Sequence, residues 1–213
     1  MKIKMAAIVL LAGFISLNAN AGFEQFNDVD GAIGVWDSAG TGYLSTITPF
    51  GLADVRSITT NNLTFELLPN INLYGDGSDP YWANGANGAK VLEGLTLWAM
   101  APGTDHELTA DIDYVQFDFN VDAYSLDRAY SMVAFVKVLD SIGETYSELV
   151  IDSVPITQLG AFQLSINPTA VMAGQLLQVG WYLRGPNVSP ANSNAYGSAT
   201  ITVTGLFALS AAQ

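Results

Sequence analysis

The chain has 213 residues, of which 50% are hydrophobic and 13% are charged, so it is long enough for a sizeable core and too apolar to be disordered. Seven Lys and Arg residues against 20 Asp and Glu residues give a net charge of −13. This balance argues against a nucleic-acid partner, because phosphate backbones are bound by basic surfaces. The chain has no Cys, which excludes disulfides, thiolate metal sites and a Cys nucleophile.

The first 21 residues are typical of a bacterial secretory signal peptide. Residues 1–4 are basic, residues 5–17 are mostly apolar, and Ala19 and Ala21 fit the small-residue rule for cleavage after Ala21. The apolar run is shorter than the roughly 20 residues that a membrane-spanning helix needs. We therefore expect a signal peptide at 1–21 and a single domain at 22–213 that is secreted or periplasmic. Without Lys2 and Lys4, that domain carries a net charge of −15.

The remaining sequence is a succession of short β-rich stretches bounded by Gly, Pro, Asn, Asp or Ser. In chain order, the expected strands are 42–47, 55–60, 63–67, 90–100, 113–121, 132–139, 147–151, 162–166, 176–184 and 199–207. No stretch shows a sustained helical period. Many short strands with regular turn signals predict an all-β fold, and we expect an antiparallel β-sandwich.

Alternation along two strands separates a buried face from a polar face. In 115–121, Val and Phe alternate with Gln116, Asp118 and Asn120. In 176–184, the same period places Trp181 with the core and Gln178, Tyr182 and Arg184 on the opposite face.

Several motifs resemble the jelly-roll modules of the carbohydrate-binding, galactose-binding-like superfamily. They are residues 134–140 (AFVKVLD), 177–187 (LQVGWYLRGPN) and 196–203 (YGSATITV), together with the opening GFEQF at 22–26 and the later Trp36. The resemblance covers most of the chain after the signal peptide. It implies a jelly roll that binds a carbohydrate. It also implies a structural calcium ion held by the opening Glu and an Asp of the last strand, where this chain has threonines at 200, 202 and 204.

Calcium is the one cofactor that the sequence suggests. Glu24 with Asp28 or Asp30 is the better candidate site, because carboxylates spaced beside Gly31 suit an oxygen-rich loop. The alternative is that Asp and Gly form an ordinary turn there. A second acidic loop at 76–79 has the same two interpretations.

Catalytic motifs are scarce. His106 is the only histidine and no Gly-x-Ser-x-Gly motif is present, so a Ser-His-Asp triad has little support. A carboxylate pair for glycoside hydrolysis remains open, although 20 acidic residues make such a pair common by chance. We leave an enzymatic role open and favour a non-catalytic one.

The candidate ligand-binding residues combine aromatic rings with planar hydrogen-bonding groups, which suit sugar rings and hydroxyls. Lys137 is the only charge in its otherwise apolar strand, 132–139, and must reach a carboxylate, a ligand or solvent. If the strands are neighbours, one concave sheet face would gather Lys137, Gln178, Tyr182, Arg184, Asp118 and Asn120, with Tyr81 and Trp82 of the 75–88 loop as a rim. The alternative is an ordinary solvated sheet face, with Trp82 capping the sandwich edge.

Three classes of function remain. The favoured one is a secreted, non-catalytic β-sandwich that recognises a poly- or oligosaccharide on a sheet face. The second is a secreted structural, matrix or surface-associated protein without a glycan ligand. The third is a small glycoside hydrolase or polysaccharide lyase. We also expect the threonine-rich segment 200–204 to be a sheet edge that can pair with another chain, so the oligomeric state stays open.

Overall fold

The computed structural model describes residues 29–37, 39, 41–50, 52–53, 55–61, 63–71, 74, 91–100, 112–142, 145–167 and 175–210. The signal peptide, the calcium candidates Glu24 and Asp28, His106, and the rim residues Tyr81 and Trp82 lie outside these ranges. The hypotheses on those residues stay predictions. Within the described ranges, no helix is both long and apolar enough to cross a membrane.

The described residues form two sheets in which all strand pairs are antiparallel. The six-stranded sheet has the order β2-β1-β5-β10-β7-β8, with β1 at Asp30–Trp36, β2 at Tyr43–Phe50, β5 at Val91–Met100, β7 at Ser131–Ile142, β8 at Thr145–Ile156 and β10 at Gln175–Pro186. The five-stranded sheet has the order β3-β4-β11-β6-β9, with β3 at Ser57–Asn61, β4 at Thr64–Leu67, β6 at Ile112–Tyr124, β9 at Gly160–Ile166 and β11 at Ala199–Ser210. A 3₁₀-helix, η2 at Pro190–Tyr196, precedes β11.

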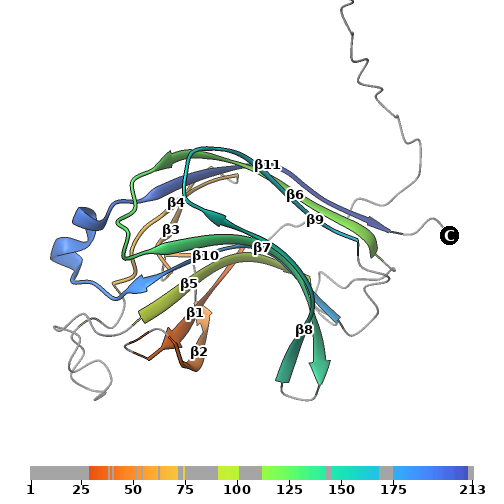
Figure 1. Ribbon diagram of the computed structural model, residues 1–213, viewed down its shortest axis with the longest axis horizontal. Helices are drawn as coiled ribbons and strands as arrows, with labels where there is room; N and C mark the ends of the chain where they lie inside the picture. The colour runs from red at the N-terminus through yellow and green to blue at the C-terminus, as the bar shows by residue number, and fades with distance from the viewer. Residues whose placement is uncertain are drawn as a thin grey trace, which may run out of the picture.

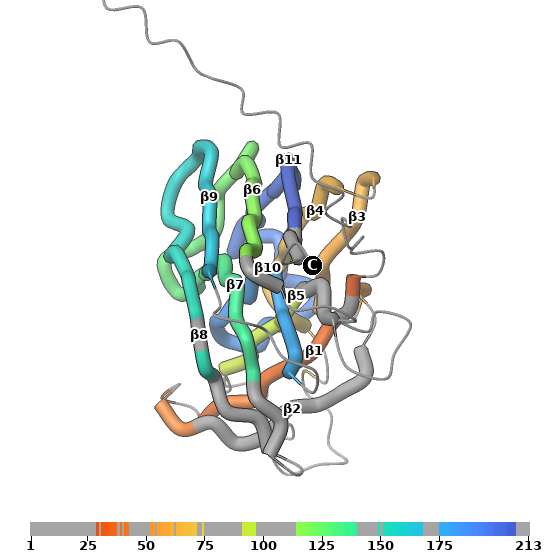
Figure 2. The backbone as a smooth tube through the Cα atoms, turned by 90° about the vertical axis from the view of Figure 1, so that its right-hand side faces the viewer, coloured from red at the N-terminus to blue at the C-terminus, as the bar shows by residue number. Residues whose placement is uncertain are grey.

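The strand order is that of a jelly roll. From β4 onward the chain crosses between the sheets at every connection except the β7–β8 hairpin, which gives the two four-stranded halves β4-β11-β6-β9 and β5-β10-β7-β8. Strands β1 and β2 extend one half and β3 extends the other (Figure 2). The predicted antiparallel jelly-roll β-sandwich is confirmed.

The core lies between the two sheets and follows the predicted alternation. On β6, Val115, Phe117, Phe119 and Val121 are buried, as are Ala199, Ile201 and Val203 on β11. Trp181 on β10 is fully buried, with its ring centroid 5.3 Å from that of Phe65 and 5.7 Å from that of Phe117. The prediction that Trp181 belongs to the core is therefore confirmed.

Both sheets are curved. Figure 1 shows the six-stranded sheet bending away from the five-stranded sheet toward β2 at one end and toward the β7–β8 hairpin at the other. Its outer face is therefore concave, and we call it the concave face.

Two sequence expectations about strands were wrong. The segment beginning at Asp30 is strand β1, not a loop, and Asp30 pairs with Leu97 of β5. Strand β8 continues beyond the predicted end at Ile151 through Pro155, which an edge strand tolerates because its outer N–H groups need no partner.

The threonine-rich segment is not a sheet edge. Strand β11, which carries Thr200, Thr202 and Thr204, lies between β4 and β6 in the five-stranded sheet. Thr200 and Thr202 are paired with β4 on one side and with β6 on the other, so this part of the segment offers no edge to another chain.

Candidate functional site

The register of two neighbouring strands, β7 and β10, brings four predicted site residues onto the concave face. Tyr182 and Arg184 on β10 lie on the face opposite the buried Trp181. Gln178 pairs directly with Lys137 of β7, and directly opposed residues of antiparallel strands share a face. The expected convergence is therefore correct for Lys137, Gln178, Tyr182 and Arg184.

A hollow of about 260 Å³ lies on this face. It crosses four adjacent strands and is lined by Glu93 and Leu95 from β5, Val133, Phe135 and Lys137 from β7, Ile151 and Ser153 from β8, and Tyr182 from β10. Tyr182 pairs with Leu95 on one side and with Val133 on the other, which places it in the middle of the lining. The hollow thus combines a central phenol with apolar walls and two charged groups.

Phe135 forms the base of this hollow. Only 1% of the residue is exposed, yet it belongs to neither of the two buried clusters between the sheets. It is buried from the concave side instead: its cross-strand neighbour is Gly180, its ring centroid lies 6.4 Å from that of Tyr182, and the Nζ of Lys137 lies 4.6 Å from the same centroid. Lys137 therefore reaches back over an aromatic ring, in a cation–π contact.

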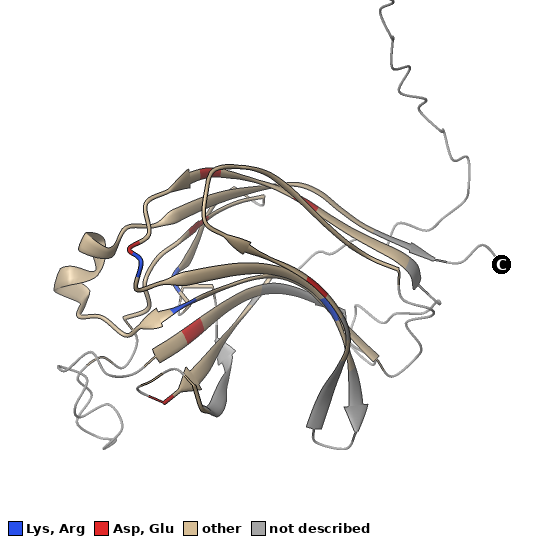
Figure 3. Cartoon of the chain, in the orientation of Figure 1, with Lys and Arg blue, Asp and Glu red and all other residues tan. Residues whose placement is uncertain are grey.

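A second cation–π contact lies at the end of the face toward β1. The guanidinium carbon of Arg184 is 3.8 Å from the centroid of the Trp36 ring. Arg184 also pairs across the strands with Glu93. Figure 3 shows red and blue segments side by side at this place on β5 and β10.

Glu93 is the carboxylate between these two cations. Burial raises its pKa above the usual value, while the positive charges of Arg184 and then Lys137 act in the opposite direction. A carboxylate in this position is partly desolvated and remains attracted to both cations. The space beside it is open because Gly34 of β1 has no side chain; a Cβ there would lie 3.4 Å from the Cβ of Glu93.

The pKa of the Tyr182 hydroxyl is also raised, first by burial and then by the negative charge of Glu93, with Arg184 opposing the change. The phenol therefore stays protonated at neutral pH and can both donate and accept a hydrogen bond. The site offers a neutral hydroxyl, a carboxylate, a guanidinium and an ammonium group around aromatic rings.

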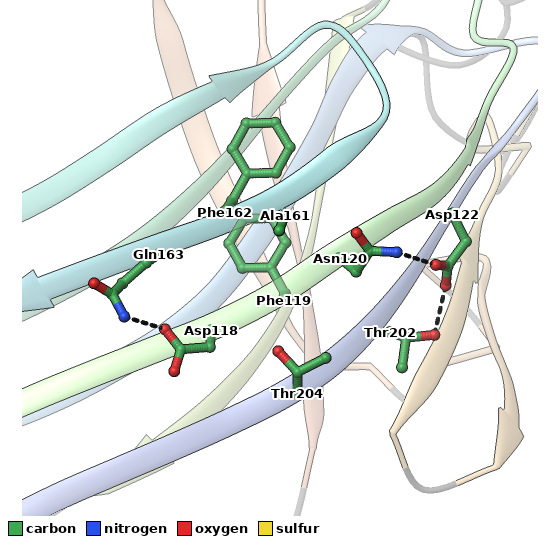
Figure 4. Close-up of a pocket in the computed structure, with 9 residues that line it drawn as sticks. All are labelled: Asp118, Phe119, Asn120, Asp122, Ala161, Phe162, Gln163, Thr202 and Thr204. Atoms are coloured by element: carbon green, nitrogen blue, oxygen red, sulfur yellow. Dashed lines mark hydrogen bonds between the residues drawn. The ribbon is translucent and has the colours of Figure 1, made fainter. Parts of the chain in front are cut away.

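Asp118 and Asn120 do not belong to this site. Strand β6 lies in the five-stranded sheet, so these two side chains are on the opposite outer surface of the sandwich. Figure 4 shows them in a separate hollow with Gln163, Asp122 and Thr202. The expectation that they converge with Lys137 was wrong, because polar alternation places a side chain on a sheet's outer face without telling which sheet.

Three charged or aromatic residues of the concave face were not predicted from the sequence. Trp36 was noted only as part of the opening motif, Glu93 only as one of many acids, and Phe135 only within an apolar strand. A usable signal existed for Glu93, because it is the one charged residue in the mostly apolar strand β5 and follows the buried Leu92. For Trp36 no such signal existed without the prediction of β1.

No protein-family model matches the chain, and no curated protein matches it. Two solved structures are similar to it in fold at low sequence identity. The structure of TmCBM61 in complex with β-1,4-galactotriose has a TM-score of 0.36 and 11% identity, over 88% of this chain and 92% of that one. A structure described as "CBM4 structure and function" has a TM-score of 0.34 and 7% identity, over 83% of this chain and 86% of that one.

Proposed function

We propose that this protein is a non-catalytic carbohydrate-binding β-sandwich whose concave face holds a poly- or oligosaccharide. The observation that carries the proposal is the position of Tyr182, half-buried at the centre of the hollow with Phe135 beneath it. Sugar rings stack on aromatic rings, and their hydroxyls hydrogen-bond to planar polar groups.

The charged groups support the same proposal. Arg184, Glu93 and Lys137 surround the aromatic residues, and the two cations are oriented by their contacts with Trp36 and Phe135. Groups that are already ordered lose little side-chain entropy when a ligand binds. They offer donors and an acceptor to neighbouring hydroxyls.

The proposal includes secretion, because polysaccharides outside the cytoplasm are accessible only to an extracellular or periplasmic protein. It depends on the predicted signal peptide at 1–21, which lies outside the described residues. Calcium at Glu24 with Asp28 or Asp30 remains a separate proposal about stability.

Binding to a panel of neutral and acidic polysaccharides, with β-1,4-galactotriose among the oligosaccharides, tests the function by calorimetry and affinity electrophoresis. Tyr182→Ala should weaken binding by about 1 kcal/mol or more, because the stacking surface is removed. Arg184→Ala should weaken it by about 1–3 kcal/mol, because ligand acceptors lose their donor.

Two matched variants separate binding from side effects. Tyr182→Phe keeps the ring and should retain most of the affinity, whereas Arg128→Ala removes an exposed arginine in the β6–β7 turn and should bind as the wild type does. If Tyr182→Ala and Arg184→Ala both stay folded and bind normally, the concave-face site is wrong. A panel without any bound polysaccharide would favour the structural or matrix role.

A further inference from the structure

The outer face of the five-stranded sheet carries a hollow that the proposed function does not use. It measures about 680 Å³ and crosses β6, β9 and β11 (Figure 4). Its polar lining consists of Asp118, Asn120, Asp122, Gln163, Thr202 and Thr204. We call these side chains, with Gln116, the polar array.

The polar array is held in place by its own hydrogen bonds. The Oδ2 of Asp118 accepts from the Nε2 of Gln116 at 2.6 Å, and its Oδ1 accepts from the Nε2 of Gln163 at 2.8 Å. The carboxylate of Asp122 accepts from Asn120 and, at 2.6 Å, from the hydroxyl of Thr202. Side chains fixed in this way need little further ordering when a ligand binds.

This arrangement leaves acceptor capacity on the lining of the hollow. Gln163 and Asn120 each donate an amide N–H to a carboxylate, so their amide oxygens are not used in these two hydrogen bonds and can accept a further one. Each carboxylate oxygen also has a second lone pair available. A ligand rich in hydroxyl donors fits such a surface.

The charges of the array favour a neutral ligand over an ion. The described lining contains two carboxylates and neither Lys nor Arg, so an anionic ligand would be repelled. Asp118 and Asp122 are four residues apart on one strand, which separates their Cα atoms by about 13 Å and prevents both from binding one cation. Among the described residues, no group of three His, Cys, Asp or Glu could hold a metal ion.

An aromatic ring lies next to the array on the same face. Phe207 of β11 is 37% exposed and pairs with Gln116. Its ring fills the space above Gly205, where a Cβ would come within 2.6 Å of the ring and 3.0 Å of the Oδ2 of Asp118. An apolar ring therefore stands directly beside an ordered carboxylate.

We propose that this face is a second saccharide-binding surface, selective for neutral saccharides, that uses Phe207 as a stacking platform and the polar array as hydroxyl acceptors. The surface is separated from the concave face by the whole core and needs none of its residues. One chain thereby presents glycan-binding surfaces on both outer faces of the sandwich.

The test uses affinity electrophoresis of the mature protein in gels containing β-1,4-galactan, xylan, galactomannan or, as the acidic probe, polygalacturonate. Tyr182→Ala removes the concave-face platform and should leave binding to at least one neutral polysaccharide. Adding Gln163→Ala and Phe207→Ala should reduce that remaining affinity at least tenfold. Phe207→Leu replaces Phe207→Ala if the latter lowers the melting temperature strongly.

Gln158→Ala is the matched control, because it removes an exposed glutamine from the β8–β9 turn outside the hollow and should change nothing. The second surface is refuted if the Gln163 and Phe207 variants migrate as their parent proteins do in every gel, whether or not the parent is retarded. That result is distinguishable from failure of the concave-face proposal, which depends on Tyr182→Ala and Arg184→Ala alone.

Discussion

Gly185 follows Arg184 on β10 and lies against the ring of Tyr130. A Cβ at position 185 would come within 2.2, 2.4 and 2.8 Å of three atoms of this ring, far inside van der Waals contact. The ring is not free to move aside, because the Tyr130 hydroxyl donates a 2.7 Å hydrogen bond to the carbonyl of Pro186 and the ring packs edge-on against Tyr196. Gly185→Ala must therefore displace Tyr130 or the strand itself.

The size of the effect follows from these contacts. Overpacking of a tight site costs about 1–3 kcal/mol, and loss of the Tyr130 hydrogen bond costs about 0.5–1.5 kcal/mol. We expect Gly185→Ala to lower the free energy of unfolding by about 2–4 kcal/mol. For a domain of this size the melting temperature should fall by roughly 5–15 °C.

Urea denaturation followed by tryptophan fluorescence measures this loss, with an unchanged m-value as evidence that both end states are preserved. Gly34→Ala is the matched control, since its Cβ would meet Glu93 and Trp36 at ordinary distances of 3.4–3.5 Å. In the double mutant with Tyr130→Leu, the cost of Gly185→Ala should largely disappear, because the obstructing ring is gone. A loss below about 0.5 kcal/mol for Gly185→Ala in the wild type would refute the steric argument.

Four further predictions concern stability and processing. Burial raises the pKa of Glu93, so the folded state binds the carboxyl proton more tightly than the unfolded state does, and wild-type stability falls as the pH rises through the raised pKa. Glu93→Gln should therefore unfold at a higher urea concentration than the wild type at neutral pH, and the difference should shrink toward pH 4.5. Gly197 has a φ of +73°, and a Cβ there would lie 2.0 Å from the carbonyl oxygen of Ser125. Gly197→Ala should therefore lower the free energy of unfolding by on the order of 2–4 kcal/mol in urea denaturation, and an unchanged free energy would contradict the argument from backbone conformation and steric overlap. EDTA should lower the melting temperature, and added calcium should restore it, if the N-terminal carboxylates hold the proposed ion; identical melting curves would reject a stabilising cation. Mass spectrometry of secreted protein should give a chain that begins at Gly22, and retention of Met1 would rule out cleavage.

The fold was predictable because its strands alternate strongly. The ten expected strands all correspond to strands of the structure, and the core position of Trp181 followed from period two alone. Strand β1 was not predicted because Gly31 and Gly34 resemble turn residues, whereas in the sheet they pair with Thr96 and Glu93 of β5. Local sequence does not contain that tertiary reason.

The site was predictable only in part, and the reason is topological. Lys137, Gln178, Tyr182 and Arg184 were recognised because each breaks or follows an alternation within its own strand. Which strands are neighbours depends on long-range pairing, so Asp118 could not be assigned to the correct sheet. Trp36 and Glu93 join the site for the same reason, through the pairing of β1, β5 and β10.

Strand β10 carries core residues and proposed ligand-binding residues at alternating positions, and this restricts how the protein can diversify. Trp181 and Leu183 are core residues, while Tyr182 and Arg184 face the candidate ligand, so inserting or deleting one residue would exchange the two sets. New specificities can therefore arise in this strand by substitution but not by a one-residue change in length. A library that varies residues 178, 182 and 184 samples binding while leaving the interior intact, whereas one that varies 181 or 183 mainly samples unfolded chains.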